Sequence, residues 1–244
     1  DGRYKDRIVW VNWGTAGRAL STGTTVKTYQ TVDTLTRLEV SCTITHSLTL
    51  GNRPEAYRPG TWPADGFPRL YRTTGGANNL VSGISIESAT SSFTVACNSA
   101  QLATYSNSTY TGKPTTTPVT LAGLVFADAE STAANPGEYA YATPGTAATW
   151  RIIDAYGGTC GTTYNAALGA GNQLQLTSNG ECSGTNGYSP MAVAFADGAT
   201  SLTVTLKGAG IEAVAIGYVL GVDYGDAPTS YGAAGAVVQP TWTG

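Results

Sequence analysis

Few residues in this chain can do acid–base or nucleophilic chemistry. It has a single histidine, His46, and no G-x-S-x-G, H-E-x-x-H or glycine-rich phosphate-binding motif. His46 continues the inward face of a run of alternating apolar residues at 36–45. A partly buried, hydrogen-bonded histidine is a simpler interpretation there than a catalytic base. We therefore predict no histidine-dependent catalysis.

Paired carboxylates are the remaining route to an enzyme. Four acids lie in or beside predicted strands: Glu138, Asp154, Asp197 and Glu212. A glycoside hydrolase needs two carboxyl groups about 5–9 Å apart in a cleft, and a sequence does not show such a distance. A secreted polysaccharide hydrolase or lyase therefore stays open as an alternative to a binding protein, although no enzyme is the prediction.

No cofactor and no metal are expected. The sequence DYGD at 223–226 offers two carboxylates, whereas Ca²⁺ usually takes about 6–8 oxygen ligands. Asp, Gly and Pro in DYGDAP are equally typical of a turn. None of the four cysteines forms a C-x-x-C pair, which argues against zinc.

A proline-rich segment at 51–79 is the best candidate for binding. It reads GNRPEAYRPGTWPADGFPRLYRTTGGANN and holds four of the eleven prolines. Structureless loops of this length are usually functional or disordered, and the aromatic content argues against disorder. Two interpretations stay open, a ligand-binding loop and a lid over an open end of the fold. The predicted ligand-binding residues are Tyr57, Arg58, Trp62, Asp65, Arg69 and Tyr71.

The chemistry of this segment suits an acidic or sugar ligand. Aromatic rings can stack on sugars or apolar side chains. Arg58 and Arg69 can pair with carboxylates, such as those of sialic or uronic acids or of acidic peptides. Asp65 can accept hydrogen bonds from hydroxyl groups. Trp62 is the predicted anchor, because binding hot spots are enriched in Trp, Tyr and Arg.

The elements that must position these residues are strands. Apolar residues alternate in TRLEVSCTIT (36–45), SFTVAC (92–97) and SLTVTL (201–206), and no stretch shows an apolar stripe of helical period. Further strands are predicted at 24–32, 119–126, 147–154, 190–196 and 212–220. Turn-forming residues divide them, which predicts an all-β fold, an antiparallel β-sandwich of lectin-like or jelly-roll-like type.

The run IVWVNWG at 8–14 contains two tryptophans, which could either bind a ligand on an exposed face or pack in the core. As a strand it is apolar on both faces, which is typical of a strand covered on both sides. A binding platform needs a face open to water. We therefore predict that Trp10 and Trp13 are mainly structural.

The cysteines predict two disulfides. Cys42 and Cys97 extend the inward faces of predicted strands, which favours a Cys42–Cys97 bridge and leaves Cys160 with Cys182. Four cysteines allow three connectivities, and spacing alone does not choose among them. An even cysteine count in a chain poor in lysine favours an exported protein.

Charge and hydropathy exclude two classes of partner. The net charge is −3 and only 12% of residues are charged, so nucleic acid is not expected. No apolar run reaches the ~18 residues that span a bilayer, so no membrane insertion is expected.

Two terminal stretches carry a resemblance to a known family. DGRYKDRIVWVNWG and GVDYGDAPTSYG resemble the boundaries of the lectin-like non-repetitive domain of CshA-type fibrillar adhesins, which are long surface proteins of Gram-positive bacteria. The resemblance implies a β-sandwich near a fibril tip that binds a host glycoprotein such as fibronectin, without catalysis. Together with the aromatic segment at 51–79, it predicts a domain that binds a glycoprotein or a glycan. The resemblance also implies an extracellular, cell-surface location.

The resemblance also sets the expected boundaries. Residues 1–222 are expected to form one domain, a monomeric module within a longer chain, and residues 223–244 to join it to the next module. A structural stalk spacer remains a third possibility, although no internal repeat is present. The family's ligand contacts do not map onto individual residues here, so the predicted site rests on the 51–79 segment.

Overall fold

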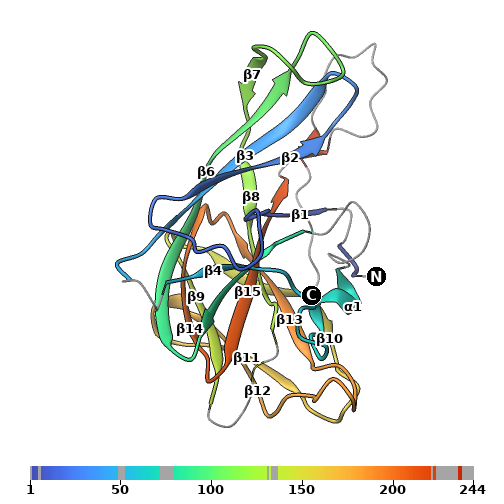
Figure 1. The fold of residues 1–244 in the computed structure, drawn as a ribbon. Helices are drawn as coiled ribbons and strands as arrows, with labels where there is room; N and C mark the ends of the chain where they lie inside the picture. Colours follow the sequence, from blue (N-terminus) through green and yellow to red (C-terminus); the bar gives the residue numbers. More distant parts are fainter. Residues whose placement is uncertain are drawn as a thin grey trace.

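The computed structural model describes residues 2–4, 7–48, 53–71, 80–130, 132, 137–220, 222–223 and 236–237. Within these residues the chain forms two antiparallel sheets that enclose a common core, a small two-stranded ribbon and one short α-helix (Figure 1). The predicted antiparallel β-sandwich is therefore confirmed.

The first sheet has seven strands. They are β1 (Ile8–Trp10), β4 (Glu55–Tyr57), β5 (Gly83–Glu87), β8 (Leu121–Asp128), β10 (Thr149–Tyr156), β13 (Met191–Asp197) and β15 (Ile211–Leu220). Their order is β10-β13-β8-β15-β5-β4, and β1 also pairs with β15.

The second sheet has eight strands. They are β2 (Thr25–Thr31), β3 (Thr36–Thr45), β6 (Thr90–Thr104), β7 (Thr115–Pro118), β9 (Tyr139–Pro144), β11 (Tyr164–Leu168), β12 (Leu174–Ser178) and β14 (Ser201–Lys207). Their order is β11-β12-β9-β14-β6-β3-β2, with β7 beside β6. At the top of Figure 1, β2, β3, β6 and β7 extend beyond the rest of the molecule. The ribbon pairs β16 (Val222–Asp223) with β17 (Ala236–Val237).

The main core lies between the two sheets and follows the period of two in the sequence. On β3 the inward residues Leu38, Val40 and Ile44 are fully buried, as predicted. Alternation places one side chain in two on each face of a strand, so the same pattern fills the core from β14 and β15. The strands predicted at 119–126, 147–154, 190–196 and 212–220 correspond to β8, β10, β13 and β15.

A second core covers the outer face of the seven-stranded sheet. The run predicted as a strand at 8–14 is buried on both sides, although only β1 within it is a strand: Val11 and Trp13, which follow β1, belong to the main core, whereas Ile8 and Trp10 belong to the second. The outward residues of β8, β13 and β15, such as Val125 and Phe195, are also buried in this second core. The predicted structural roles of Trp10 and Trp13 are therefore confirmed.

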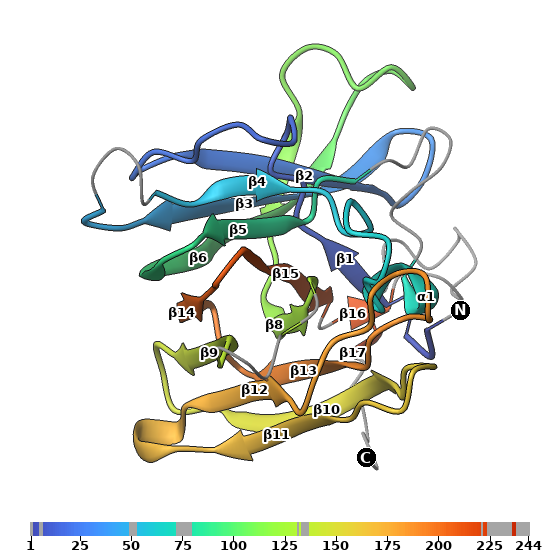
Figure 2. The same ribbon diagram turned by 60° about the horizontal axis from the view of Figure 1, so that its bottom comes forward.

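The segment predicted as a structureless loop covers this second core. It contains β4 and the helix α1 (Phe67–Leu70), which lies beside β1 in Figure 2. The Trp10 ring packs edge-on against Phe67 and Tyr71, with ring centroids 4.9 Å and 5.2 Å apart. The prediction of a loop without secondary structure is wrong, because its aromatic residues fold onto the apolar outer face of a sheet.

Both predicted disulfides are present. Cys42–Cys97 joins the neighbouring strands β3 and β6, where the pairing shifts between Ser41 and Thr43. Cys160–Cys182 joins the segment after β10 to the segment before β13. The first bridge thus ties two strands of one sheet, and the second ties two loops.

We predict that Trp10→Ala lowers the free energy of unfolding by about 3–5 kcal/mol, because it empties a buried aromatic position in the second core. Chemical denaturation followed by tryptophan fluorescence or circular dichroism measures this change. Trp62→Ala is the matched control, since Trp62 is far more exposed than Trp10, and we expect it to change stability by less than about 1 kcal/mol. Equal losses in the two variants would contradict the existence of the second core.

Candidate functional site

The exposed part of the predicted site is a small aromatic and cationic surface. We call it the Trp62 surface and define it as Trp62, Pro63, Arg69 and Tyr188. The Trp62 side chain is 40% exposed. The exposed Arg69 guanidinium lies 4.5 Å from the centroid of the Tyr188 ring, in cation–π contact. The predicted segment therefore supplies an apolar ring and a positive charge to this surface, and Tyr188 comes from a separate loop.

A buried carboxylate holds the backbone beneath the Trp62 surface. Asp65 Oδ2 accepts hydrogen bonds from the Tyr57 hydroxyl and the Gly60 amide, both at 2.9 Å. The Asp65 amide donates to the Trp62 carbonyl at 3.2 Å. These bonds close the turn that carries Trp62, so its ring is presented by a fixed backbone.

A second loop supports the same surface from the side. The Ser189 amide donates to the Ala64 carbonyl at 2.8 Å. Gly66 lies so close to the Ser189 carbonyl that a side chain at this position would clash with it. The Cys182 amide donates to the Ser189 hydroxyl at 2.8 Å, which ties this loop to the Cys160–Cys182 bridge. Segments far apart in the sequence therefore form one surface.

The six predicted ligand-binding residues divide into two groups. Trp62 and Arg69 are exposed and Arg58 is half-buried, whereas Tyr57, Asp65 and Tyr71 are buried. Tyr71 donates its hydroxyl to Asp154 Oδ2 at 2.8 Å. Burial, together with the adjacent carboxylates, raises the pKa of Tyr57 and of Tyr71. The stacking role expected for the two tyrosines is thus corrected to a supporting role, and Asp65 supports the backbone instead of facing solvent.

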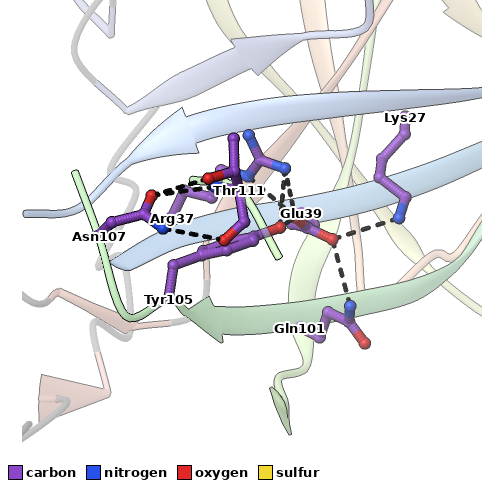
Figure 3. A network of polar contacts seen from close by, with 7 residues as sticks. All are labelled: Lys27, Arg37, Glu39, Gln101, Tyr105, Asn107 and Thr111. Atoms are coloured by element: carbon purple, nitrogen blue, oxygen red, sulfur yellow. Dashed lines mark hydrogen bonds and ion pairs between the residues drawn. The ribbon is translucent and has the colours of Figure 1, made fainter. Parts of the chain in front are cut away.

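Sequence reasoning missed a polar network on the outer face of the eight-stranded sheet. Glu39 on β3 accepts hydrogen bonds at its two carboxylate oxygens from four side chains (Figure 3). The donors are the Tyr105 hydroxyl at 2.7 Å, Arg37 Nε at 2.9 Å, Lys27 Nζ at 3.2 Å and Gln101 Nε2 at 3.3 Å. Burial alone raises the pKa of Glu39, but these bonds outweigh it and lower the pKa to about 2.

Arg37 of this network also contacts aromatic rings, one of which is exposed to solvent. The Arg37 guanidinium lies 4.0 Å from the ring centroid of Tyr29, a side chain that is 50% exposed. The rings of Tyr105 and Tyr110 lie 4.9 Å and 5.3 Å from it. The polar outward residues of the predicted 36–45 strand, Arg37 and Glu39, were the signal in the sequence.

Three glutamates meet in the interior at one end of the sheets. One carboxylate oxygen from each of Glu130, Glu138 and Glu212 lies within 4.8 Å of the other two, and all three residues are buried. We call them the glutamate cluster. Burial and repulsion from nearby carboxylates raise the pKa of Glu130 to about 10, and they also raise the pKa of Glu212 and of Asp128. Buried carboxylates do not line an open cleft for a polysaccharide.

The other acids considered for catalysis lie elsewhere. Asp154 accepts hydrogen bonds from Tyr71 and from the Arg3 amide at 2.7 Å, and Asp197 forms an ion pair with Arg151 at 3.7 Å. Of the four candidate acids, the structure thus brings only Glu138 and Glu212 together.

The single histidine has structural partners. His46 Nε2 lies 2.8 Å from the Leu20 carbonyl, and the Leu48 amide donates to His46 Nδ1 at 3.2 Å. The expected half-buried, hydrogen-bonded histidine is therefore confirmed.

The structure does not describe all of the predicted binding segment or of the DYGD sequence. Residues 51–52 and 72–79 of the predicted binding segment lie outside the described residues, as do residues 224–226 of the DYGD sequence.

Comparison with known proteins identifies one family. The family model described as surface adhesin CshA non-repetitive domain 2 matches residues 6–220. No significant similarity to a curated protein or to a solved structure was found. Among the described residues, no helix has the length and apolar character needed to cross a bilayer.

We predict that Glu39→Gln lowers the free energy of unfolding by about 2–3 kcal/mol at neutral pH, because it removes a charge that four donors stabilise. Since the pKa of Glu39 is about 2 when folded and about 4.5 ordinarily, this stabilisation is present above the ordinary pKa. It is lost as the pH falls toward 2. Urea unfolding between pH 7 and pH 2 should show the variant and the wild type converging.

The control is Glu55→Gln, which changes an exposed glutamate on β4. We expect it to alter stability by less than about 0.5 kcal/mol at any pH. A constant difference between Glu39→Gln and the wild type across this pH range would contradict the role given to the network.

Proposed function

The chain belongs to the surface adhesin CshA non-repetitive domain 2 family, and we propose that it is a non-catalytic binding domain that recognises a host glycoprotein of the fibronectin kind, or a glycan. Family membership supports a role in a cell-surface adhesin and an extracellular or cell-surface location. We further propose that residues 1–222 act as one monomeric module and that residues 223–244 join it to the next part of a longer surface protein.

The Trp62 surface is the proposed contact with the ligand. The observation that carries this proposal is a tryptophan that is 40% exposed, on a backbone that is hydrogen-bonded to Asp65 and to Ser189. A rigid aromatic anchor binds with little loss of conformational entropy. Trp62 is also the most exposed of the aromatic residues predicted to bind, and tryptophan is among the residues most enriched in binding hot spots.

The neighbouring cation indicates the chemistry of the ligand. Arg69 lies over the Tyr188 ring in cation–π contact. A guanidinium in such a contact can still form paired hydrogen bonds with a carboxylate through its N–H groups. An apolar or sugar ring against Trp62 and an acidic group against Arg69 form one compatible ligand. Sialic acid, uronic acid and an acidic peptide each have such a group.

We predict that Trp62→Ala weakens ligand binding about thirtyfold, which corresponds to about 2 kcal/mol, while the melting temperature stays within about 2 °C of the wild type. The ligand is first identified on an array of matrix glycoproteins, including fibronectin, and of neutral, sialylated and uronic-acid glycans. Surface plasmon resonance then gives the affinity of each variant. Arg69→Gln should weaken binding to acidic ligands and spare neutral ones.

Tyr29→Ala is the matched control, because it also removes an exposed aromatic ring, but one on strand β2 of the eight-stranded sheet. It should leave the affinity unchanged. If Tyr29→Ala abolishes binding and Trp62→Ala does not, the ligand contacts the Arg37 side of the molecule. If Trp62→Ala lowers the melting temperature and spares affinity, the segment acts as a lid. Release of sugars from the arrayed glycans by the wild type would favour the polysaccharide hydrolase or lyase.

A further inference from the structure

We propose that the glutamate cluster of Glu130, Glu138 and Glu212 is a binding site for one Ca²⁺ ion. The three carboxylates come from separate parts of the chain. Glu130 follows the end of β8, Glu138 immediately precedes β9, and Glu212 is the second residue of β15. A bound cation would therefore link the seven-stranded sheet to the eight-stranded sheet.

The backbone around the cluster positions Glu138 from the sheet edge. Glu138 Oε1 accepts hydrogen bonds from the amides of Ala209 and Gly210, at 2.6 Å and 3.2 Å. These amides lie in the connection between β14 and β15, where the chain passes from one sheet to the other. The same connection leads directly to Glu212, so one turn sets the distance between the two carboxylates.

The buried carboxylate of Glu212 indicates that a ligand binds in the glutamate cluster. Its side chain is 0% exposed, and neither of its carboxylate oxygens has a hydrogen-bond partner in the part of the chain that the structure describes. It lies on the same face of β15 as Val214 and Ile216, which belong to the main core. A carboxylate buried without a donor is strongly disfavoured. Glu130 Oε2 is likewise buried without a partner among the described residues.

The donor set selects a hard cation. All three side chains offer oxygen, whereas zinc sites in proteins are built mostly from cysteine and histidine. Oxygens within 4.8 Å of one another can share one Ca²⁺, because two ligands on opposite sides of this ion at ~2.3–2.6 Å stand about 5 Å apart. Mg²⁺ binds at about 2.0–2.1 Å and retains several waters, which suits a buried carboxylate cage less well.

The charge of the surroundings also favours a divalent cation. Asp128, whose Oδ2 accepts a hydrogen bond from Thr132 at 3.0 Å, has its Oδ1 buried without a described partner. Extracellular modules commonly bind Ca²⁺ with dissociation constants of about 0.1–1 mM. The site shares no residue with the Trp62 surface, so this inference does not depend on the proposed function.

The test begins with the wild-type 244-residue chain, stripped of metal with EDTA and dialysed. Isothermal titration calorimetry with CaCl₂ should show one Ca²⁺ per chain. The melting temperature should rise with Ca²⁺ over about 0.1–10 mM, because an ion that binds only the folded state stabilises it by mass action. MgCl₂ at the same concentrations should give a clearly smaller rise. Absence of binding and of any rise with CaCl₂ would overturn the proposal, and an equal rise with MgCl₂ would overturn the assignment to Ca²⁺.

Two variants and one control locate the ion. Glu212→Gln and Glu138→Gln should each weaken Ca²⁺ binding at least about tenfold and reduce the Ca²⁺-dependent rise in melting temperature. Glu39→Gln makes the same chemical change at a buried glutamate whose partners are protein side chains, so its Ca²⁺ response should match that of the wild type. If the Ca²⁺ response survives in both cluster variants, or if Glu39→Gln removes it, the ion does not bind at the glutamate cluster.

Discussion

The seven-stranded sheet is apolar on both faces, and the need to cover both faces is the constraint on which the remaining structure depends. The eight-stranded sheet buries one face, and it cannot reach the other. Trp10, Phe67 and Tyr71 cover the second face through β1 and α1. Because apolar burial contributes about 25 cal/mol per Å², these large aromatic rings favour folding of the proline-rich segment onto the sheet. The position of Trp62 follows from that docking, since Trp62 lies in the turn between β4 and α1.

Two buried glutamates show how strongly the local set of partners decides the state of a carboxylate. Glu39 lies on the outer face of β3 and has four side-chain donors, and its pKa falls to about 2. Glu212 lies on the inner face of β15, without a described hydrogen-bond donor and among other acids, and its pKa rises. Both side chains are almost fully removed from solvent. Burial raises the pKa of both groups; at Glu39 four hydrogen-bond donors outweigh it, whereas at Glu212 the neighbouring acids add to it. The neighbours thus distinguish the hydrogen-bonded network of Glu39 from the proposed cation site.

Much of the fold follows from the period of two in the sequence, because strands such as β3, β6 and β14 pair one buried face with a more exposed one. The inward positions Leu38, Val40 and Cys42 were predictable in this way, and so was the bridge from Cys42 to Cys97. The 51–79 segment was not, because proline and aromatic residues are equally compatible with an exposed loop and with a segment docked on a sheet. Only the three-dimensional structure distinguishes the buried Tyr57 and Tyr71 from the exposed Trp62. Glu138 and Glu212 were among four acids considered for a carboxylate pair, but which of them meet depends on the connection from β14 to β15.

The Cys160–Cys182 bridge anchors the loop that supports the Trp62 surface, which has little regular secondary structure. The bridge closes the part of the chain that includes β11 and β12, and Cys182 is hydrogen-bonded to Ser189. The Ser189 amide in turn donates a hydrogen bond to the carbonyl of Ala64, two residues from Trp62. The neighbouring Tyr188 ring is in cation–π contact with Arg69. A disulfide chiefly restricts the unfolded chain, and a loop of this size contributes roughly 3 kcal/mol in the chain-entropy model. The order of the Trp62 surface thus derives from a covalent tie and a buried aspartate, and both are in place before any ligand arrives.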